Sequence, residues 1–335
     1  MIWLIKGCIM EEINIRSFGA YAPSLVITNE ALSELVETSD EWITSRTGIK
    51  ERRISEGEDT SQISVKAAKV ALDRANLKGE DIDLIVVATI TPDTFTPSVA
   101  CLVQKEIGAV NAMAFDINAA CSGFIYGLQV AYSMMSIGNF KNTLVIGAET
   151  LSKIIDWEDR STCVLFGDGG GAVVLSKDDK DFSKKLFSFY SKSEGNKGES
   201  LTTHAVDVIN PYVKEEKIRN KKIYMNGREV FKFATTSIVN AVKELLDKNN
   251  LVKEDVDFIV CHQANYRIIE YSARKLGISI DKFFINLDRY GNTSSASIPI
   301  ALNEMYEKGL LKKGMKIILV GFGGGLTYGS VLIEL

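Results

Sequence analysis

Very few side chains in this chain of 335 residues can act as a nucleophile or a general base near neutral pH. There are two histidines, His204 and His262, and five cysteines. Five is an odd number and no two cysteines have Cys-x-x-Cys spacing, so neither a disulfide framework nor a zinc knuckle is expected. Any chemistry therefore depends on a small number of positions. The cysteines are Cys8, Cys101, Cys121, Cys163 and Cys261.

Cys121 lies at a predicted junction between a strand and a helix. Residues 113–120 (MAFDINAA) are typical of a strand that ends in small residues, and residues 121–135 (CSGFIYGLQVAYSMM) of a buried apolar helix. The positive end of a helix dipole favours a thiolate, and its unpaired N–H groups can bind an oxyanion. Cysteine is also a common core residue, so position alone leaves a nucleophile and an inert thiol equally open. Cys101 and Cys163 are expected to be inert buried thiols.

His262 and Asn292 each lie where a strand or turn is predicted to end. His262 closes the apolar run FIVCH (258–262), and ligand sites form at the carboxyl ends of strands in open α/β sheets. Asn292 lies in RYGNTSSASIP (289–299), a turn ahead of a predicted helix. A core histidine and an ordinary turn asparagine remain open alternatives. His204 lies in a polar segment and is expected to face solvent.

Two glycine runs, GDGGGA (167–172) and GFGGGL (321–326), resemble nucleotide-binding loops. Neither ends in Gly-Lys-Ser/Thr, and the second lies too near the C-terminus to precede a βαβ unit. We expect these glycines to allow chain segments to approach the nucleophile closely.

An internal repeat indicates two similar halves. Residues 67–80 (AAKVALDRANLKGE) recur 174 positions later as residues 241–254 (AVKELLDKNNLVKE), each followed by an apolar run. An amphipathic helix, a turn and a short apolar strand are typical of α/β units with buried, mainly parallel strands. We predict an N-terminal half over 10–176, a polar surface excursion over 177–222 and a C-terminal half over 223–335.

Composition and charge exclude several classes of protein. The chain is 46% hydrophobic with a net charge of −4, which argues against disorder and against a nucleic-acid-binding domain. The apolar opening over residues 1–9 is too short to span a bilayer and is expected to be an extra segment before a start at Met10. Unpaired cysteines suit the cytoplasm, and no membrane insertion is expected.

From about Ile13 to the C-terminus, the chain resembles β-ketoacyl-acyl-carrier-protein synthase III, the condensing enzyme that initiates bacterial type II fatty-acid synthesis. Six motifs in order carry the resemblance: TSDEWITSRTGI (38–49), DINAACSGF (116–124), FGDGGGA (166–172), HQANYRI (262–268), RYGNTSSASIP (289–299) and GFGGGLTYGS (321–330). The resemblance implies a thiolase-like α/β fold, with two βαβαβαββ halves in five α-β-α-β-α layers.

The resemblance also implies a catalytic set of Cys121, His262 and Asn292. A thiolase would carry Cys–His–Cys and an elongating ketosynthase Cys–His–His; plant-type polyketide synthases share Cys–His–Asn but not the flanking HQAN and YGNTSSASIP. Cys121 would take an acyl group from acyl-CoA, with the N–H groups of Cys121 and Gly324 as the oxyanion hole. His262 and Asn292 would donate hydrogen bonds during decarboxylation of malonyl-acyl-carrier protein. No metal or cofactor is implied.

Contacts to substrates and partners are implied by motif position. Thr96 would border the acyl pocket, where acetyl-preferring relatives carry Phe; the smaller residue favours a roomier pocket, although Phe95 could compensate. A homodimer is also implied. Residues expected around CoA and its pantetheine arm are Thr38, Trp42, Arg46, Arg160, Arg228 (where Asn is frequent) and Asn265, and those expected to meet the carrier protein are Gln263, Arg267, Arg274 and Lys275.

Two other functions stay open. One is a related thiolase-fold acyltransferase or ketosynthase of specialised metabolism, which would use the same three residues with another acceptor. The other is a non-catalytic acyl-binding protein, which would have no need of a complete Cys–His–Asn set.

Overall fold

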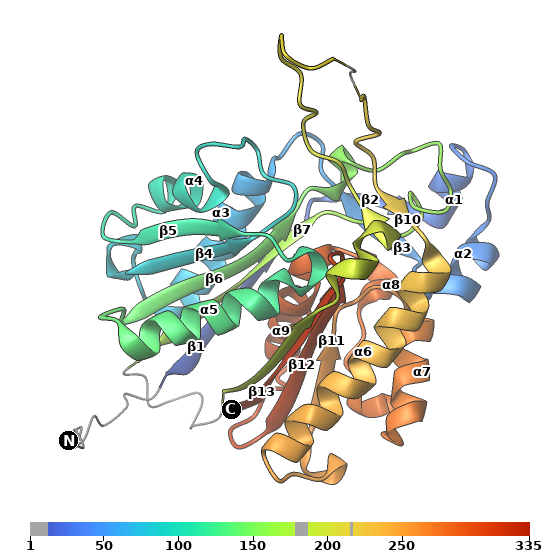
Figure 1. Ribbon diagram of the computed structural model, residues 1–335. Helices are drawn as coiled ribbons and strands as arrows, with labels where there is room; N and C mark the ends of the chain where they lie inside the picture. Colours follow the sequence, from blue (N-terminus) through green and yellow to red (C-terminus); the bar gives the residue numbers. More distant parts are fainter. Residues whose placement is uncertain (1–12, 178–186, 215–216) are drawn as a thin grey trace.

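The computed structural model describes residues 13–177, 187–214 and 217–335. The extra segment predicted over residues 1–9, the start at Met10 and Cys8 lie outside the described residues. Within them, two larger sheets stand side by side, each flanked by helices, and two further sheets have two strands each (Figure 1).

The first sheet has five strands in the order β1-β7-β6-β4-β5. Strands β6, β4 and β5, which are adjacent at one side of the sheet, run parallel to one another. Strand β7 is antiparallel to both of its neighbours, β6 and β1. Every residue of β4 (LIVVA) is buried, as expected for a parallel strand covered on both faces. The bounds are β1 Asn14–Tyr21, β4 Leu84–Ala88, β5 Met113–Ile117, β6 Asn142–Glu149 and β7 Gly169–Ser176.

The second sheet has the order β11-β12-β13-β8, with β11 and β12 parallel and the other pairs antiparallel. Its edge strand β8 lies inside the segment that we predicted to be a surface excursion. That prediction is wrong for β8: the polar sequence SFYSKS is typical of a half-exposed edge strand as well as of a loop. The bounds are β8 Ser188–Ser193, β11 Phe258–Cys261, β12 Lys316–Gly323 and β13 Thr327–Glu334.

The helices complete five layers. Helices α5 (Gly123–Ile137) and α9 (Ser297–Glu307) lie between the sheets, since α5 packs against β4, β6, β12 and β13, and α9 against β1, β7 and β11. Helices α3 (Thr60–Ala75) and α4 (Val99–Glu106) cover the outer face of the first sheet. Helix α6 (Gly227–Lys248) covers that of the second sheet and packs against α7 (Tyr266–Leu276). The predicted α-β-α-β-α arrangement is confirmed (Figure 1).

The repeated segments form the same succession of elements. Residues 67–80 cover the end of α3 and a 3-10 turn before β4, and residues 241–254 cover the end of α6 and a 3-10 turn before β11. The carboxyl ends of β5 and β11 both point to the interface between the two sheets, where α5 and α9 begin (Figure 1). The duplication therefore brings Cys121 and His262 to one region.

Smaller elements complete the described part of the fold. They are β2 (Leu25–Thr28), α1 (Asn29–Ser33), α2 (Asp40–Thr47), β3 (Glu51–Ile54), α8 (Leu287–Tyr290), the short pair β9 (Leu201–Thr202) and β10 (Tyr224–Met225), and the 3-10 turns η2 (Ala120–Ser122) and η7 (Ser294–Ala296).

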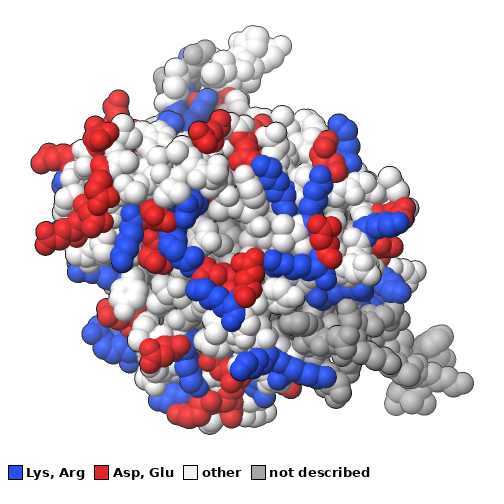
Figure 2. All heavy atoms as spheres, turned by 180° about the vertical axis from the view of Figure 1, so that it is seen from behind, with Lys and Arg blue, Asp and Glu red and all other residues white. Residues whose placement is uncertain are grey.

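The surface carries charges of both signs. On the face opposite to that of Figure 1, acidic and basic side chains are interspersed and form no continuous basic field (Figure 2). Among the described residues, no helix has the length and apolarity needed to cross a membrane. No cluster of three or more possible metal ligands occurs in that part of the chain either.

Candidate active site

Cys121 lies in the tight turn η2 between β5 and α5, as predicted. The preceding residue, Ala120, has φ of +46°, a left-handed conformation that is strained for a residue with a Cβ. The turn places the Cys121 side chain in the buried interface between the halves, where 7% of the residue is exposed. Strained backbone at a buried cysteine is typical of a held nucleophile.

The glycines of GFGGGL bring the end of β12 against Cys121. A Cβ on Gly323 would lie 2.6 Å from the Cys121 Cβ and 3.1 Å from its Sγ. A Cβ on Gly321 would lie 3.1 Å from the Cα of Ser122. The prediction that these glycines allow close approach to the nucleophile is confirmed for this run. In GDGGGA, by contrast, Gly167 and Gly171 accommodate Tyr290 and Pro299.

We expect Gly323→Ala to reduce acylation of Cys121 by about a hundredfold, because the new methyl group displaces the nucleophile by a fraction of an ångström to about 1 Å. Overpacking should also lower the free energy of unfolding by about 1–3 kcal/mol. Acylation rates from acyl-CoA and chemical denaturation measure both effects. The exposed Gly195→Ala is the control, because an added Cβ there meets nothing within 4 Å and Gly195, like Gly323, has no positive φ. Native acylation by the Gly323 variant would contradict the expectation.

His262 follows β11 and is buried. Its Nδ1 lies 2.7 Å from the Oγ of Ser297, and that hydroxyl donates to the carbonyl of Ser294 at 2.9 Å. The single proton of Ser297 is thus used, so Nδ1 carries the hydrogen and Nε2 is left with a free lone pair. Burial lowers the pKa of His262 to about 3, which keeps the resting ring neutral near pH 7.

Asn292 reaches the same region from the loop before η7. Its backbone is fixed by Asn292 N donating to Leu165 O at 2.8 Å and by Gly167 N donating to Asn292 O at 3.0 Å. Its Oδ1 accepts from Ser294 N at 2.9 Å. With the oxygen engaged, the Nδ2 hydrogens are the part of the amide that can serve a ligand.

These three residues line one cavity of about 230 Å³, with Trp42, Asn265 and Phe322 also in its walls. A second cavity of about 880 Å³ also reaches Cys121 and is lined by Phe95, Leu201, His204, Ser294 and Gly324, among others. Cys121 therefore lies between two spaces. The arrangement allows one group to approach the thiol through the first cavity while the attached group extends into the second.

Cys121 is held as a thiol rather than a thiolate. Burial raises the pKa of its thiol to about 12, and the carboxyl group of Glu149 acts in the same direction. A hydrogen bond donated by the Ser294 hydroxyl would lower it, but that hydroxyl donates its hydrogen to Glu149 Oε1. The helix N-terminus that led us to expect a thiolate is opposed by loss of solvent. The site thus pairs a neutral thiol with a neutral imidazole.

The residues predicted around CoA fall into two groups. Trp42, Arg46 and Asn265 line the smaller cavity, and the guanidinium of Arg46 lies 4.5 Å from the Trp42 ring centroid. Arg160 lies outside this lining but 5.1 Å from the same ring. A ring stacked between the two side chains would need a separation of about 7 Å between the Trp42 ring and the Arg160 guanidinium, because each stacking contact takes about 3.5 Å. The two side chains would therefore have to move apart.

Two predicted CoA contacts do not line the cavity. Thr38 is half-buried beside α2, and its Oγ1 has no hydrogen-bond partner. Arg228 is exposed in the first turn of α6, whose neighbouring residues Gly227 and Val230 line the cavity instead. Arg228 therefore lies at the edge of the smaller cavity and does not line it.

Of the residues predicted to meet a carrier protein, Arg267, Arg274 and Lys275 are exposed on α7. Gln263 is a correction, because it is buried. Its Nε2 donates to Cys261 O at 2.8 Å and to Phe284 O at 3.1 Å, and its Oε1 accepts from Asn286 N at 3.0 Å. Gln263 is a structural residue that joins β11 to the loop before α8.

Two further predictions, for Thr96 and Cys101, are corrected, and the one for His204 is confirmed. Thr96 is exposed and lines neither cavity of this chain, whereas its neighbour Phe95 lines the larger one while remaining 80% exposed. His204 is exposed as expected but also borders the larger cavity. Cys101 is exposed on α4 rather than buried, because that helix turns this face away from the first sheet. Cys163 is buried as predicted.

Sequence reasoning missed the polar residues behind the site. Ser297 orients His262, and the buried Glu149 lies close enough to Cys121 to affect its pKa. The only signal for Glu149 was an acidic residue closing the apolar run LVIGAE. The run SSAS held Ser294 and Ser297, but nothing in it showed which hydroxyl faces which group.

Comparison with known proteins gives a consistent result. Family models described as 3-oxoacyl-[acyl-carrier-protein (ACP)] synthase III, and as its C-terminal part, match residues 115–195 and 246–335. The β-ketoacyl-[acyl-carrier-protein] synthase III of Clostridium beijerinckii is 57% identical over 325 residues, covering 97% of this chain and 100% of the relative.

Solved structures agree with the sequence comparison. The crystal structure of 3-oxoacyl-[acyl-carrier-protein] synthase III from Aquifex aeolicus is 47% identical, with a TM-score of 0.90, covering 97% of this chain and 100% of that one. The priming β-ketosynthase of the R1128 polyketide pathway is 32% identical, with a TM-score of 0.87 and 97% coverage of both chains.

Proposed function

The chain belongs to the β-ketoacyl-[acyl-carrier-protein] synthase III family, and on this premise we propose how its own residues carry out the reaction. It is an acyltransferase of the condensing type that initiates type II fatty-acid synthesis. The single observation that carries the proposal is that Cys121, His262 and Asn292, drawn from both halves, line one cavity. The 57% identity with the Clostridium relative, against 32% with the polyketide priming enzyme, favours fatty-acid synthesis over specialised metabolism.

In the first half-reaction, the sulfur of Cys121 attacks the thioester carbonyl of an acyl-CoA. The thiol proton passes to Nε2 of His262, which is free because Nδ1 holds the ring hydrogen. The N–H groups of Cys121 and Gly324 stabilise the tetrahedral oxyanion. The bond to CoA then breaks and CoA leaves as a thiolate, so that the acyl group is on Cys121 and the proton is on His262.

In the second half-reaction, malonyl-acyl-carrier protein loses CO₂, and the electron pair of the broken bond moves to the thioester as an enolate. The Nδ2 hydrogens of Asn292 and the Nε2–H of the protonated His262 stabilise its oxygen. The developing negative charge offsets the cost of a buried imidazolium. The enolate carbon attacks the acyl group, the Cys121 thiolate leaves, and His262 returns the proton to it.

The motif implies that His262 donates a hydrogen bond during decarboxylation. In the mechanism proposed here, His262 first accepts the thiol proton and donates only afterwards. A neutral ring with its hydrogen on Nδ1 cannot donate from Nε2, so His262 becomes a donor only after it has taken the thiol proton. Both half-reactions balance without an electron acceptor or a metal. We therefore propose that the enzyme uses no cofactor besides its two substrates.

The test of this function is acylation of the purified enzyme by a panel of straight and branched acyl-CoAs, followed by peptide mass spectrometry. We expect an acyl adduct on Cys121 that disappears when malonyl-acyl-carrier protein is added, with release of a β-ketoacyl product. Absence of an adduct with every acyl-CoA, or an adduct on another residue, would contradict the proposal.

The primer class follows from the larger cavity. Its volume of about 880 Å³ next to Cys121 has room for more than an acetyl group, and Ile90, Leu151 and Leu201 contribute apolar wall. We propose that branched or longer primers are accepted. In the same panel, this expectation fails if acetyl-CoA alone acylates Cys121.

The carrier protein is proposed to dock on α7, beside the mouth of the smaller cavity. Asn265 and Ile268 at the start of this helix line the cavity, and Arg267 is exposed between them. Arg274 and Lys275 are exposed two turns further along, so a basic surface begins at the entrance. An acidic carrier protein would be attracted to it despite the net charge of −4.

We expect the double variant Arg267→Glu/Arg274→Glu to raise KM for malonyl-acyl-carrier protein by about tenfold or more, with a weaker dependence on salt. The rate of Cys121 acylation by acyl-CoA should change little. Lys312→Glu/Lys313→Glu makes the same change in charge at exposed residues before β12, at the end of the strand away from Cys121. Equal effects of the two double variants would show that only net charge matters.

A homodimer is proposed from exposed apolar side chains around the larger cavity. Residues 203–214 project from the body (Figure 1), and Tyr212 within them is 92% exposed. Phe95 and Val206, which line the larger cavity, are 80% and 59% exposed and present apolar surface that a second copy of the chain would cover. Sedimentation equilibrium tests this, and a monomer at micromolar concentration would contradict it. We propose the cytoplasm as the location, where CoA thioesters and free thiols are found.

A further inference from the structure

Glu149, the last residue of β6, is fully buried behind the active site and has no part in the mechanism above. Its Oε2 accepts from Thr91 Oγ1 at 2.6 Å and from Thr89 Oγ1 and Ile90 N at 3.0 Å each. Its Oε1 accepts from Ser294 Oγ at 3.1 Å and Ser295 Oγ at 3.0 Å. One carboxyl group thus joins a loop of the N-terminal half to the loop of the C-terminal half that carries Asn292.

The contact with Ser294 leads directly to the nucleophile. Ser294 lines the larger cavity together with Cys121, and its turn η7 packs against the turn η2 that carries the thiol. A hydroxyl has one hydrogen. While Ser294 donates that hydrogen to Glu149, it can offer the sulfur only a lone pair, which suits an S–H group and not a thiolate.

We propose that Glu149 is a positioning residue for the nucleophile: by holding the Ser294 hydroxyl hydrogen, it keeps the resting Cys121 protonated until His262 takes its proton in the presence of an acyl-CoA. This inference rests on the proposed role of Cys121. It goes beyond that role by assigning a use to a buried acid outside the Cys–His–Asn set. An enzyme whose thiolate forms only on demand is protected from alkylation and oxidation at rest.

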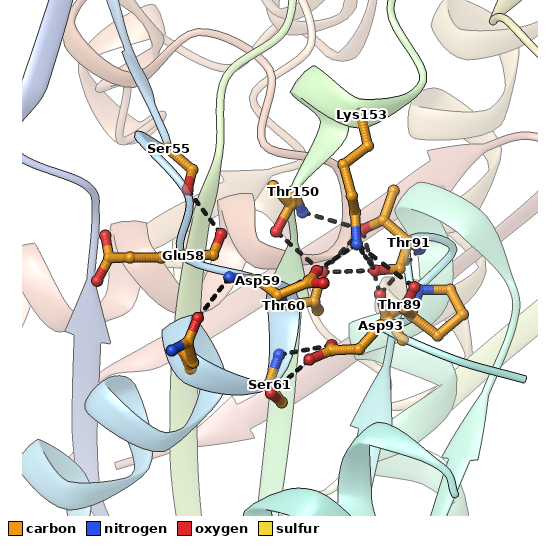
Figure 3. Close-up of polar contacts among 12 residues, drawn as sticks. Ser55, Glu58, Asp59, Thr60, Ser61, Thr89, Thr91, Asp93, Thr150 and Lys153 are labelled. Carbon is orange, nitrogen blue, oxygen red and sulfur yellow. Dashed lines mark hydrogen bonds and ion pairs between the residues drawn. The ribbon is translucent and has the colours of Figure 1, made fainter. Parts of the chain in front are cut away.

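The surroundings of Glu149 on the other side fix its position. Thr91 Oγ1 accepts from Thr150 N at 2.9 Å, and Thr91 O accepts from Lys153 Nζ at 2.9 Å (Figure 3). Thr60 also donates to Thr91 O, and Lys153 is paired with Asp59 (Figure 3). The carboxyl group therefore cannot move away from Ser294 without breaking this network.

The titratable and charged groups near Glu149 are few. Cys121 lies on η2, and His262 connects to Ser294 O through Ser297. Lys153 and Asp59 lie beyond Thr91. Burial raises the pKa of Glu149 itself, while its hydrogen bonds act in the opposite direction. None of the other four groups is altered by the variants below.

Glu149→Gln changes the direction of one hydrogen bond. The amide oxygen must occupy the position of Oε2, because Ile90 N donates there and an NH₂ group cannot accept. The amide nitrogen then faces Ser294 and Ser295, and donates. Ser294 becomes an acceptor on this side, and its own hydrogen is free to bond the sulfur of Cys121. A hydrogen bond to the thiolate favours ionisation.

The experiment measures the rate of Cys121 alkylation by iodoacetamide from about pH 6 to about pH 10, in the absence of CoA substrates, by peptide mass spectrometry. We expect Glu149→Gln to react about tenfold faster at each pH, which moves the profile by about one pH unit. The double variant Glu149→Gln/Ser294→Ala should lose this acceleration. Because no acyl-CoA is used, the result does not depend on whether the chain condenses any substrate.

Ser295→Ala is the matched control. It removes the other hydroxyl near Oε1, from an equally buried neighbour in the same turn, together with the hydrogen bond from that hydroxyl to Ala88 O at 2.8 Å, and should leave the alkylation profile unchanged. If Glu149→Gln does not fold, Glu149→Asp withdraws the carboxyl group from Ser294, whose hydrogen bond is the longest of the five at 3.1 Å. That variant should also react faster. Three results would overturn the proposal. They are an alkylation profile that does not move in the Glu149 variants, acceleration that survives the addition of Ser294→Ala, and equal acceleration by Ser295→Ala.

Discussion

Replacing Cys121 by alanine is expected to lower condensation to less than about one-thousandth of the native rate, because among the described residues Cys121 is the only nucleophilic side chain that lines both cavities. Acylation by acyl-CoA should be lost completely. Decarboxylation of malonyl-acyl-carrier protein should continue at a reduced rate, since Asn292 still donates to the enolate oxygen whereas His262 receives no proton from Cys121. Release of CoA, release of CO₂ and formation of the β-ketoacyl product are measured separately.

Cys163→Ala provides the control for the loss of a buried thiol, since Cys163 is equally buried but lines neither cavity. It should keep native acylation. If Cys121→Ala still released CoA from an acyl-CoA and formed product, another residue would have to be the nucleophile. A fall in both partial reactions to the same extent would instead point to collapse of the site.

Replacing Asn292 by alanine is expected to lower decarboxylation by about a hundredfold to a thousandfold, the usual effect of removing one oxyanion donor. Acylation of Cys121 should change by much less, because the thiol proton goes to His262 and the oxyanion of that step faces backbone N–H groups. Single-turnover acylation and steady-state release of CO₂ separate the two half-reactions.

Asn292→Asp sharpens the same test. Its carboxylate would retain the acceptor for Ser294 N but present negative charge where the enolate forms. Decarboxylation should therefore fall at least as far as in Asn292→Ala, with the local backbone better preserved. Native CO₂ release by either variant would show that Asn292 only shapes the turn. An equal loss of acylation would contradict the division of roles between Asn292 and His262.

Most of the fold followed from patterns that local physics produces. Buried parallel strands such as LIVVA are apolar throughout, and the repeat of residues 67–80 as 241–254 carried the same helix, turn and strand into both halves. The segment containing β8 was misassigned because a half-exposed edge strand needs few apolar residues. Its pairing with β13 depends on a partner more than a hundred residues away in the chain.

The motifs located residues that the structure brings together, but they did not give the direction of every side chain. Cys121, His262 and Asn292 were found by their motifs, and all three line one cavity. Gln263 is next to His262 in the same motif, yet it points into the core, because consecutive residues leaving a strand face opposite sides. Thr96 has the motif position but lines neither cavity of this chain.

By itself, the sequence determined the two-fold α/β architecture, the family and the three residue types that can do the chemistry. Only the tertiary structure decided their protonation. The Nδ1 hydrogen of His262 follows from Ser297, and the thiol of Cys121 from burial and from Glu149. The physical reason is that hydrogen-bond direction and loss of solvent are set by groups packed from both halves, whose separation along the chain leaves no local pattern.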